Sequence, residues 1–317
     1  MIEAHGLTKR YGPKTAVDGI SFTVRPGIVT GFLGPNGAGK STTMRMIMGL
    51  DKPTAGSVTV NGKAYVQLKS PLSEVGALLE ARAVHPGRSA RSHLLVLAAT
   101  HNIPASRVDE VIELTGLESV ATKRVGGFSL GMGQRLGIAS ALLGDPKTLI
   151  LDEPVNGLDP EGVLWVRNLA RYLASQGRTV FLSSHLMSEM ALTADHVIVI
   201  GRGKILADAP MQEFVESASK RSVRVRAADM DKLTPALEAA GGTTALSATE
   251  DDGSAVSVTG LEAAAIGELA LTHGVVLHEL TPIASTLEEA YMELTATSVE
   301  YHAVDMDTTT TTEGGQR

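Results

Sequence analysis

The sequence predicts an α/β protein with a parallel sheet in its first part and a smaller α+β domain after it. Within residues 29–50, a short apolar run leads into a glycine-rich loop and then into a helix with apolar residues at helical spacing. Two later apolar runs, in 147–154 and 178–186, end in polar side chains. Buried strands between helices favour a parallel sheet, whereas segments of alternating polarity beyond about residue 221 favour an antiparallel one.

Composition places the chain among globular proteins and narrows its partners. Its 317 residues are 43% hydrophobic and 20% charged, and this length suggests two domains or one large domain with an appendage. The net charge of -7 argues against a protein whose main task is to bind nucleic acid. The absence of cysteine excludes disulfides and thiolate metal sites. Because no signal-peptide pattern opens the chain and no apolar run reaches the roughly 18 residues of a membrane span, we expect a cytoplasmic protein.

A phosphate-binding loop follows the first apolar run. The pattern G-x-x-x-x-G-K-[ST] lies between a buried strand and a helix, which is the context that this loop requires. The loop comprises Gly34, Pro35, Asn36, Gly37, Ala38, Gly39, Lys40, Ser41 and Thr42. Its backbone amides converge on phosphate oxygens, and we expect Lys40 to reach the β- and γ-phosphates and Ser41 to bind Mg²⁺. The alternative is a glycine-rich turn that holds a lysine by chance.

Two acids end the second apolar run. In KTLILDEP, a buried strand leads to Asp152 and Glu153. Because ligands bind beyond the carboxyl ends of the strands in such sheets, these acids point at the same crevice as the phosphate loop. We expect Asp152 to bind Mg²⁺, directly or through water, and Glu153 to act as a general base on the attacking water. The alternative is a pair of solvated acids that close a strand.

A histidine ends the third apolar run. The segment RTVFLSSHL places His185 at the crevice end of another core strand, where it is positioned to contact the γ-phosphate or the attacking water. A lone histidine is more often structural, and this alternative stays open. None of the other histidines shows metal-ligand spacing.

Taken together, these residues resemble the ATP-binding subunit of ABC transporters over about residues 2–215. The phosphate loop matches the Walker A motif of that family, LILDE matches Walker B with Glu153 as the catalytic glutamate, and His185 matches the switch histidine. NGLD, which ends at Asp159, matches the D-loop and is expected to contribute to the nucleotide site. FSLGM, at 128–132, matches the signature motif, which is usually LSGGQ.

The resemblance implies a P-loop NTPase core with an antiparallel β subdomain and a helical subdomain at about 86–145, all within a domain of residues 1–215. It implies ATP and Mg²⁺ as cofactors, with Tyr11 stacked on adenine unless it is an ordinary turn tyrosine. The family binds ATP between two subunits arranged head to tail, in a homodimer or a heterodimer. Ser129, Gly131 and the helix N-terminus after them would then complete the partner's ATP site.

Two positions depart from the family pattern. Leu130 and Met132 replace the usual Gly and Gln of the signature motif, and we expect the phosphate contacts to survive because Ser129 and Gly131 remain. Glu80 stands where the Q-loop has its Mg²⁺-binding glutamine. A glutamate can also bind Mg²⁺, and we favour this role for Glu80. The alternative is that Glu80 is a solvated loop residue and that the alignment is off by one position.

The C-terminal region has the order β-α-β-β-α-β over about 222–281, which predicts a ferredoxin-like domain within a unit of residues 222–300. The segment STLEEAYMELTA that follows is similar to the C-terminal helix of drug-exporter ATPases of the daunorubicin-resistance type. The unit either regulates the ATPase or supports its dimer, or it is a passive appendage. The tail 301–317 has little to bury and is expected to be disordered.

Two functions fit these motifs. The first is the ATP-hydrolysing subunit of an ABC transporter that exports a drug, an antibiotic or another hydrophobic compound. It would be bound to a separately encoded permease at the cytoplasmic face of the membrane. The second is a soluble ABC ATPase that acts on nucleic acid or the ribosome. The single GKS motif, the absence of sustained heptads and the acidic balance favour the first, with no nucleic-acid partner.

Overall fold

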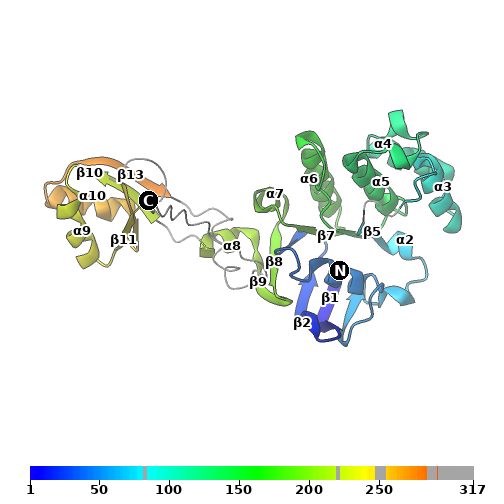
Figure 1. Cartoon of the computed structure of the whole chain (residues 1–317), viewed down its shortest axis with the longest axis horizontal. Coiled ribbons are helices and arrows are strands. Elements are labelled where there is room, and N and C mark those ends of the chain that lie inside the picture. The colour runs from blue at the N-terminus through cyan, green and yellow to red at the C-terminus, as the bar shows by residue number, and fades with distance from the viewer. Residues whose placement is uncertain (81–83, 219–221, 247–254, 284–290, 292–317) are drawn as a thin grey trace, which may run out of the picture.

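The protein is described here by a computed structural model, which covers residues 1–80, 84–218, 222–246, 255–283 and Tyr291. Its N-terminal part contains two sheets surrounded by helices, and its C-terminal part contains a separate sheet (Figure 1). The predicted α/β core, with an antiparallel β layer, a helical layer and a later α+β unit, is confirmed.

A six-stranded sheet forms the centre of the N-terminal part, in the order β5-β6-β7-β3-β8-β9. Its strands are parallel except for β9, which pairs antiparallel with β8. The strands are β3 (Val29–Leu33), β5 (Val75–Leu78), β6 (Thr148–Leu151), β7 (Thr179–Ser184), β8 (His196–Gly201) and β9 (Lys204–Pro210). Every residue of β3, β6 and β7 is buried. Both faces of this sheet are covered by other elements, which explains why these apolar runs are continuous.

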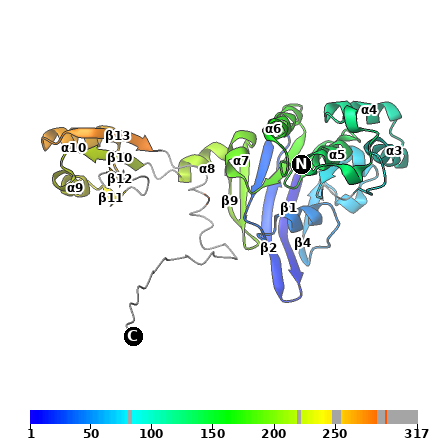
Figure 2. The same ribbon diagram turned by 45° about the horizontal axis from the view of Figure 1, so that its top comes forward.

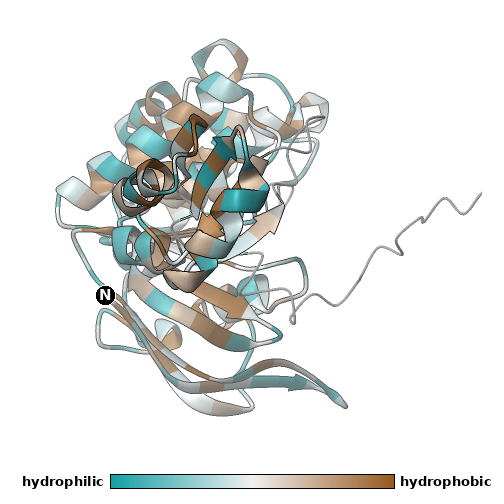
Figure 3. Cartoon of the chain, turned by 90° about the vertical axis from the view of Figure 1, so that its left-hand side faces the viewer, coloured by the Kyte–Doolittle hydropathy of each residue, from teal (hydrophilic) through white to brown (hydrophobic). Residues whose placement is uncertain are grey.

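A three-stranded antiparallel sheet covers one face of the central sheet. Its order is β2-β1-β4, and its strands are β1 (Ile2–Tyr11), β2 (Lys14–Val24) and β4 (Ala55–Val60). Buried and exposed residues largely alternate along β2 and in part along β1, so that one face of these strands packs inward. Figure 3 shows the mixed hydropathy of the residues along this sheet. Phe22 of β2 stacks 5.9 Å from Phe32 and 5.9 Å from Phe181, between ring centroids. This aromatic contact joins the two sheets next to the first helix.

The helices divide between the two faces of the central sheet and a separate group. They are α1 (Lys40–Ile47), α2 (Pro71–Glu74), α3 (Ala90–Thr100), α4 (Ala105–Leu114), α5 (Leu130–Leu142), α6 (Pro160–Ser175), α7 (Met187–Thr193) and α8 (Met211–Ala218). Helix α1 packs between the two sheets, whereas α5 and α6 pack on the other face of the central sheet. Helices α3, α4 and α5 lie together at the upper right of Figures 1 and 2.

The C-terminal unit has a four-stranded antiparallel sheet in the order β11-β12-β10-β13. Its elements are β10 (Ser222–Ala227), α9 (Met230–Ala239), β11 (Thr243–Leu246), β12 (Ala255–Thr259), α10 (Ala263–Thr272) and β13 (Leu277–Ile283). Leu233, Leu237 and Ile266 of its helices are fully buried against the sheet. This β-α-β-β-α-β arrangement is the predicted ferredoxin-like fold. The turn between β11 and β12 and the tail 301–317 lie outside the described residues.

Tyr291 belongs to the core of the N-terminal part, not to that of the C-terminal unit. It is 5% exposed and lies in the same apolar cluster as residues of α5, α6 and β7. Burial, together with the negative charge of Glu153, raises the pKa of Tyr291 to about 12. The rest of the predicted helix STLEEAYMELTA lies outside the described residues.

Candidate active site

The phosphate loop lies between β3 and α1, at the carboxyl end of the central sheet. Gly39 adopts a φ of 112°, in the left-handed region that favours glycine, and α1 begins at the next residue. A Cβ on Gly34 would lie 2.5 Å from the Ile200 carbonyl oxygen, so this position has no room for a side chain. The loop therefore has the close backbone packing that a phosphate cradle needs.

Lys40 is buried at the base of this loop. Its side chain is 6% exposed, and Nζ donates to the Gly34 carbonyl oxygen at 2.6 Å. Nζ also lies 3.5 Å from Oε1 of Glu153. The predicted phosphate-binding lysine and the predicted catalytic acid therefore form an ion pair in this structure.

Glu153 occupies an unusual backbone conformation at the end of β6. Its φ is 49°, which is uncommon for a residue other than glycine. Its amide donates to the Ser183 Oγ at 2.9 Å, and its carboxylate Oε2 lies 2.7 Å from the Nδ1 of His185. The acid of one strand and the histidine of the neighbouring strand thus meet beside Lys40, as the shared crevice predicts.

The predicted Mg²⁺ ligands line one cavity of about 420 Å³. Ser41, Glu80 and Asp152 all face it, with Arg45 and His93 on its wall. Asp152 accepts a hydrogen bond from the Ser183 hydroxyl, which fixes the orientation of its carboxylate. A hydroxyl and two carboxylates are hard oxygen donors, and this set suits Mg²⁺.

Tyr11 lies beside the loop, with 47% of its surface exposed. Its hydroxyl donates to Asp51 Oδ2 at 3.0 Å, and Lys9 Nζ lies 4.9 Å from its ring centroid. Burial and the hydrogen bond to Asp51 raise the pKa of Tyr11, and the charge of Arg45 and a hydrogen bond with Thr42 partly offset this rise. Because Thr42 ends the phosphate loop, Tyr11 is close enough to the site for its predicted role, which stays a prediction.

The signature segment is separate from this constellation. Ser129 caps α5, and its Oγ accepts a hydrogen bond from the Met132 amide at 3.2 Å. Asp159 likewise caps α6 and accepts from the Gly162 amide at 2.9 Å. Among the described residues, no hydrogen bond or ion pair joins Ser129, Gly131 or Asp159 to residues 34–42. Within one chain, these three predicted nucleotide contacts are not brought to the loop.

Comparison with known proteins agrees with this geometry. The family model of the ABC transporter matches residues 17–156. The bacitracin transport ATP-binding protein BcrA of Bacillus licheniformis is 41% identical over 241 residues, which cover 75% of this chain and 78% of that protein. The chain belongs to the ATP-binding proteins of ABC transporters. It is an ATPase, and the resemblance stated from its motifs is confirmed.

Other relatives extend this similarity along the chain. The uncharacterized ABC transporter ATP-binding protein YhcH of Bacillus subtilis (strain 168) is 34% identical over 314 residues, covering 95% of this chain and 97% of that protein. A dimeric ATP-binding cassette in a post-hydrolysis state bound to ADP and Pi has the same fold, with a TM-score of 0.61 at 23% identity, over 67% of this chain and 99% of that one. Residues 221–288 match a domain of unknown function.

Two features of the ABC ATPase site were not predicted from its motifs. Ser183 contacts both acids, donating to Asp152 and accepting from the Glu153 amide. Gln134 of α5 reaches the Glu153 carbonyl oxygen. Ser183 stands two residues before His185, and Gln134 follows the signature motif, so both lie near recognised motifs; their partners, however, are distant in sequence.

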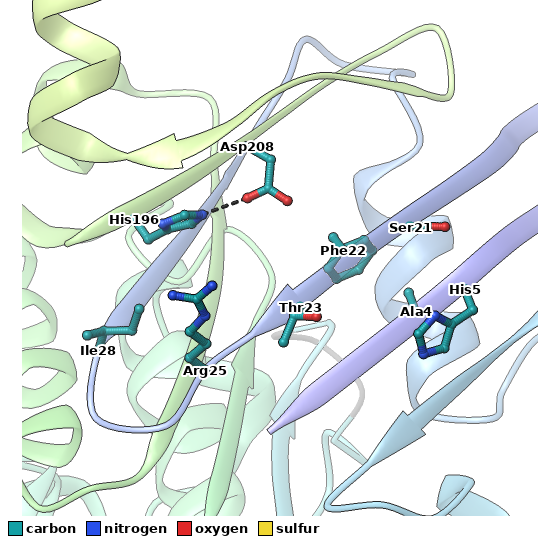
Figure 4. A pocket seen from close by; sticks show the side chains of 9 residues that line it. All are labelled: Ala4, His5, Ser21, Phe22, Thr23, Arg25, Ile28, His196 and Asp208. Atoms are coloured by element: carbon teal, nitrogen blue, oxygen red, sulfur yellow. Dashed lines mark hydrogen bonds and ion pairs between the residues drawn. The ribbon is translucent and has the colours of Figure 1, made fainter.

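A second cavity, of about 320 Å³, lies at the opposite end of the central sheet. Ile28, which precedes β3, and His196, which begins β8, line it, and His196 Nε2 lies 2.6 Å from Asp208 Oδ1 (Figure 4). None of the predicted site residues faces this cavity. The predicted nucleotide-site residues lie instead at the carboxyl ends of the strands, where ligands bind in open α/β sheets.

Among the described residues, no helix combines the length and apolarity needed to span a membrane.

Proposed function

We propose that this ABC ATPase powers the export of a peptide antibiotic or another hydrophobic drug through a separate membrane permease. The contact of Glu153 with both Lys40 and His185 is the observation that carries hydrolysis, because it places a base beside the phosphate-binding lysine. Relatives named for bacitracin and lantibiotic transport support the substrate class. These names also favour a transporter over a nucleic-acid or ribosome ATPase.

The residues fit ATP and Mg²⁺. The amides of the loop and Lys40 would bind the β- and γ-phosphates, and Tyr11 would stack on adenine. Ser41, Asp152 and Glu80 would hold Mg²⁺, which neutralises charge on the phosphates when it is bound.

The ion pair between Lys40 and Glu153 suggests how the base is released. Phosphate oxygens compete for Lys40 when nucleotide enters, and the Glu153 carboxylate then loses its cation partner. It becomes free to accept a proton from the attacking water, while His185 holds its other oxygen in place. In this scheme, the buried ion pair of Lys40 and Glu153 keeps the carboxylate from acting as a base until ATP is present.

A head-to-tail dimer would complete each site. Ser129, Gly131 and the N-terminus of α5 of one subunit would contact the γ-phosphate held by the other, with Asp159 nearby. A dimer of two such chains, or of this chain with a related ATPase, would lie at the cytoplasmic face of the membrane beneath the permease. The cavity lined by Glu80 and His93 opens between the central sheet and α3, which belongs to the helical subdomain that would meet the permease.

Replacing the base tests this proposal. We expect Glu153→Gln to lower the rate of phosphate release at least about 100-fold, because the amide cannot accept the proton. ATP binding is expected to persist, and the variant should form a stable dimer with ATP in size-exclusion chromatography. Glu161→Gln, an exposed acid in the first turn of α6, is the matched control. Hydrolysis by Glu153→Gln at the rate of that control would refute the assignment.

A further inference from the structure

We propose that Gln134 is a positioning residue that links the signature helix of one ATP site to the catalytic glutamate of the other. This inference rests on the proposed head-to-tail dimer and on the proposed role of Glu153. In such a dimer, the signature segment of a subunit serves its partner's ATP, whereas its Glu153 serves its own. A direct bond between these two elements of one chain therefore connects the two sites.

The bond comes from the interior of α5. Gln134 is 4% exposed, and its Nε2 donates to the Glu153 carbonyl oxygen at 2.8 Å. Its Oε1 is buried and has no hydrogen-bond partner within the part of the chain that the structure describes. Burying an amide with an unsatisfied oxygen is unfavourable, and an apolar side chain of similar size would fill the same space without that cost. The one interaction that the amide makes with the described residues and an apolar side chain could not make is the hydrogen bond to the Glu153 carbonyl oxygen.

The carbonyl group that accepts this hydrogen bond belongs to Glu153, whose backbone conformation has to be stabilised. Glu153 has a positive φ of 49°, which its backbone adopts only when its surroundings impose it. Ser183 accepts from its amide, and Gln134 and the Asn156 amide both donate to its carbonyl oxygen, the latter at 3.2 Å. These contacts hold the peptide groups on both sides of Cα. The direction of the carboxylate toward Lys40 and His185 follows from that backbone.

The N-terminus of α5 is also in contact with the D-loop. A Cβ on Gly157 would lie 2.4 Å from Leu130 Cδ2, so Leu130 lies directly against this glycine. Leu130, which replaces the usual glycine of the family, thus contacts Gly157 of the same chain. Through Leu130 and Gln134, a displacement of the signature helix reaches residues 153–157 at two points. The structure has a direct route from a partner's nucleotide to the chain's own base.

The first test separates positioning from folding. Gln134→Met keeps the volume and removes the donor, and Thr115→Val is the matched control, since it removes a buried hydroxyl that donates to Val111 at 2.7 Å, far along the chain from Glu153. We expect Gln134→Met to lower kcat about 10-fold or more while the Kd for ATP changes less than about twofold. The control should keep its kcat, and the thermal midpoints of both variants check that each is folded. A kcat for Gln134→Met equal to that of the control would overturn the proposal.

The second test asks which site Gln134 serves, in dimers of two differently tagged full-length chains. When one subunit carries Gln134→Met and the other Glu153→Gln, the only intact base lies in the chain that lacks Gln134, and we expect hydrolysis to fall about 10-fold below that of the wild-type and Glu153→Gln dimer. When both changes are in one subunit, hydrolysis should match that reference dimer. The reverse pattern would show that Gln134 acts only on the partner's site and would overturn the proposal.

The reference dimer, of one wild-type and one Glu153→Gln subunit, distinguishes a failure of the proposed function from a failure of the proposed role of Gln134. If it hydrolyses ATP at about half the wild-type rate, as one intact site of two predicts, the proposed function stands and the result for Gln134 is decisive. If Glu153→Gln homodimers hydrolyse ATP normally, the proposed role of Glu153 fails before Gln134 is considered.

Discussion

Glu153 shows why single residues in this site depend on their neighbours. Its carboxylate contacts Lys40 and His185, and its backbone is held by Ser183. The identity of the acid was predictable from a buried strand that ends in Asp-Glu. Its positive φ and its bond to Ser183 were not, because both depend on the pairing of β6 with β7, which brings distant segments together.

His93 is expected to make the stability of the protein depend on pH. Its side chain faces the cavity of the predicted Mg²⁺ ligands, and burial, together with the charge of Arg88, lowers its pKa below the usual 6.5. The unfolded chain therefore binds a proton at a higher pH than the folded chain does. This contribution to stability is complete above 6.5 and is lost as pH falls through the folded pKa.

Urea unfolding at a series of pH values checks this expectation. The free energy of unfolding of the wild type should fall on acidification below 6.5 more steeply than that of His93→Gln. Parallel pH profiles for the two proteins would contradict it, as would a histidine resonance in NMR that titrates at the ordinary value.

The signature helix α5 shows how much of an element can be read from sequence. A helix after Ser129 and Gly131 was predicted, but α5 already begins at Leu130, because Ser129 is its cap. The close approach of α5 to β5 was not predictable, since no local pattern tells which strand a helix will cover. A Cβ on Gly76 of β5 would lie 2.0 Å from the Ala141 carbonyl oxygen of α5, so backbone packs directly on backbone here.

Filling this contact tests the packing of the element. We expect Gly76→Val to lower the free energy of unfolding by about 1–3 kcal/mol or more, because the side chain forces the helix off the sheet. Gly127→Ala is the control, because no atom of the described residues lies within 4 Å of the Cβ that it would add. Equal urea midpoints for the two variants would show that α5 does not pack closely on β5.

Each chain carries two separate groups of predicted site residues, which would belong to two different ATP sites of a dimer. The loop, Glu153 and His185 gather at one place, whereas Ser129 and Gly131 lie on a helix with no polar bond to that loop among the described residues. This division was expected from the resemblance to ABC transporter ATPases, in which the signature motif serves the ATP of the partner subunit. The strand order β5-β6-β7-β3-β8, which creates the shared crevice, differs from the chain order and emerges only from the fold. The role of the C-terminal unit stays a prediction, although Tyr291 joins the core of the N-terminal part.

Mixing two inactive variants tests the central claim that a signature segment serves the partner's ATP. Lys40→Ala removes the phosphate-binding lysine, and Ser129→Arg places a bulky charge in the signature segment, so each homodimer should be inactive. A mixed dimer restores one complete site, formed by the loop of the Ser129→Arg chain and the signature segment of the Lys40→Ala chain. Random mixing should recover about a quarter of wild-type hydrolysis, since half of the dimers carry one intact site of two. If the mixture stays as inactive as either variant alone, the signature segment does not act across the dimer.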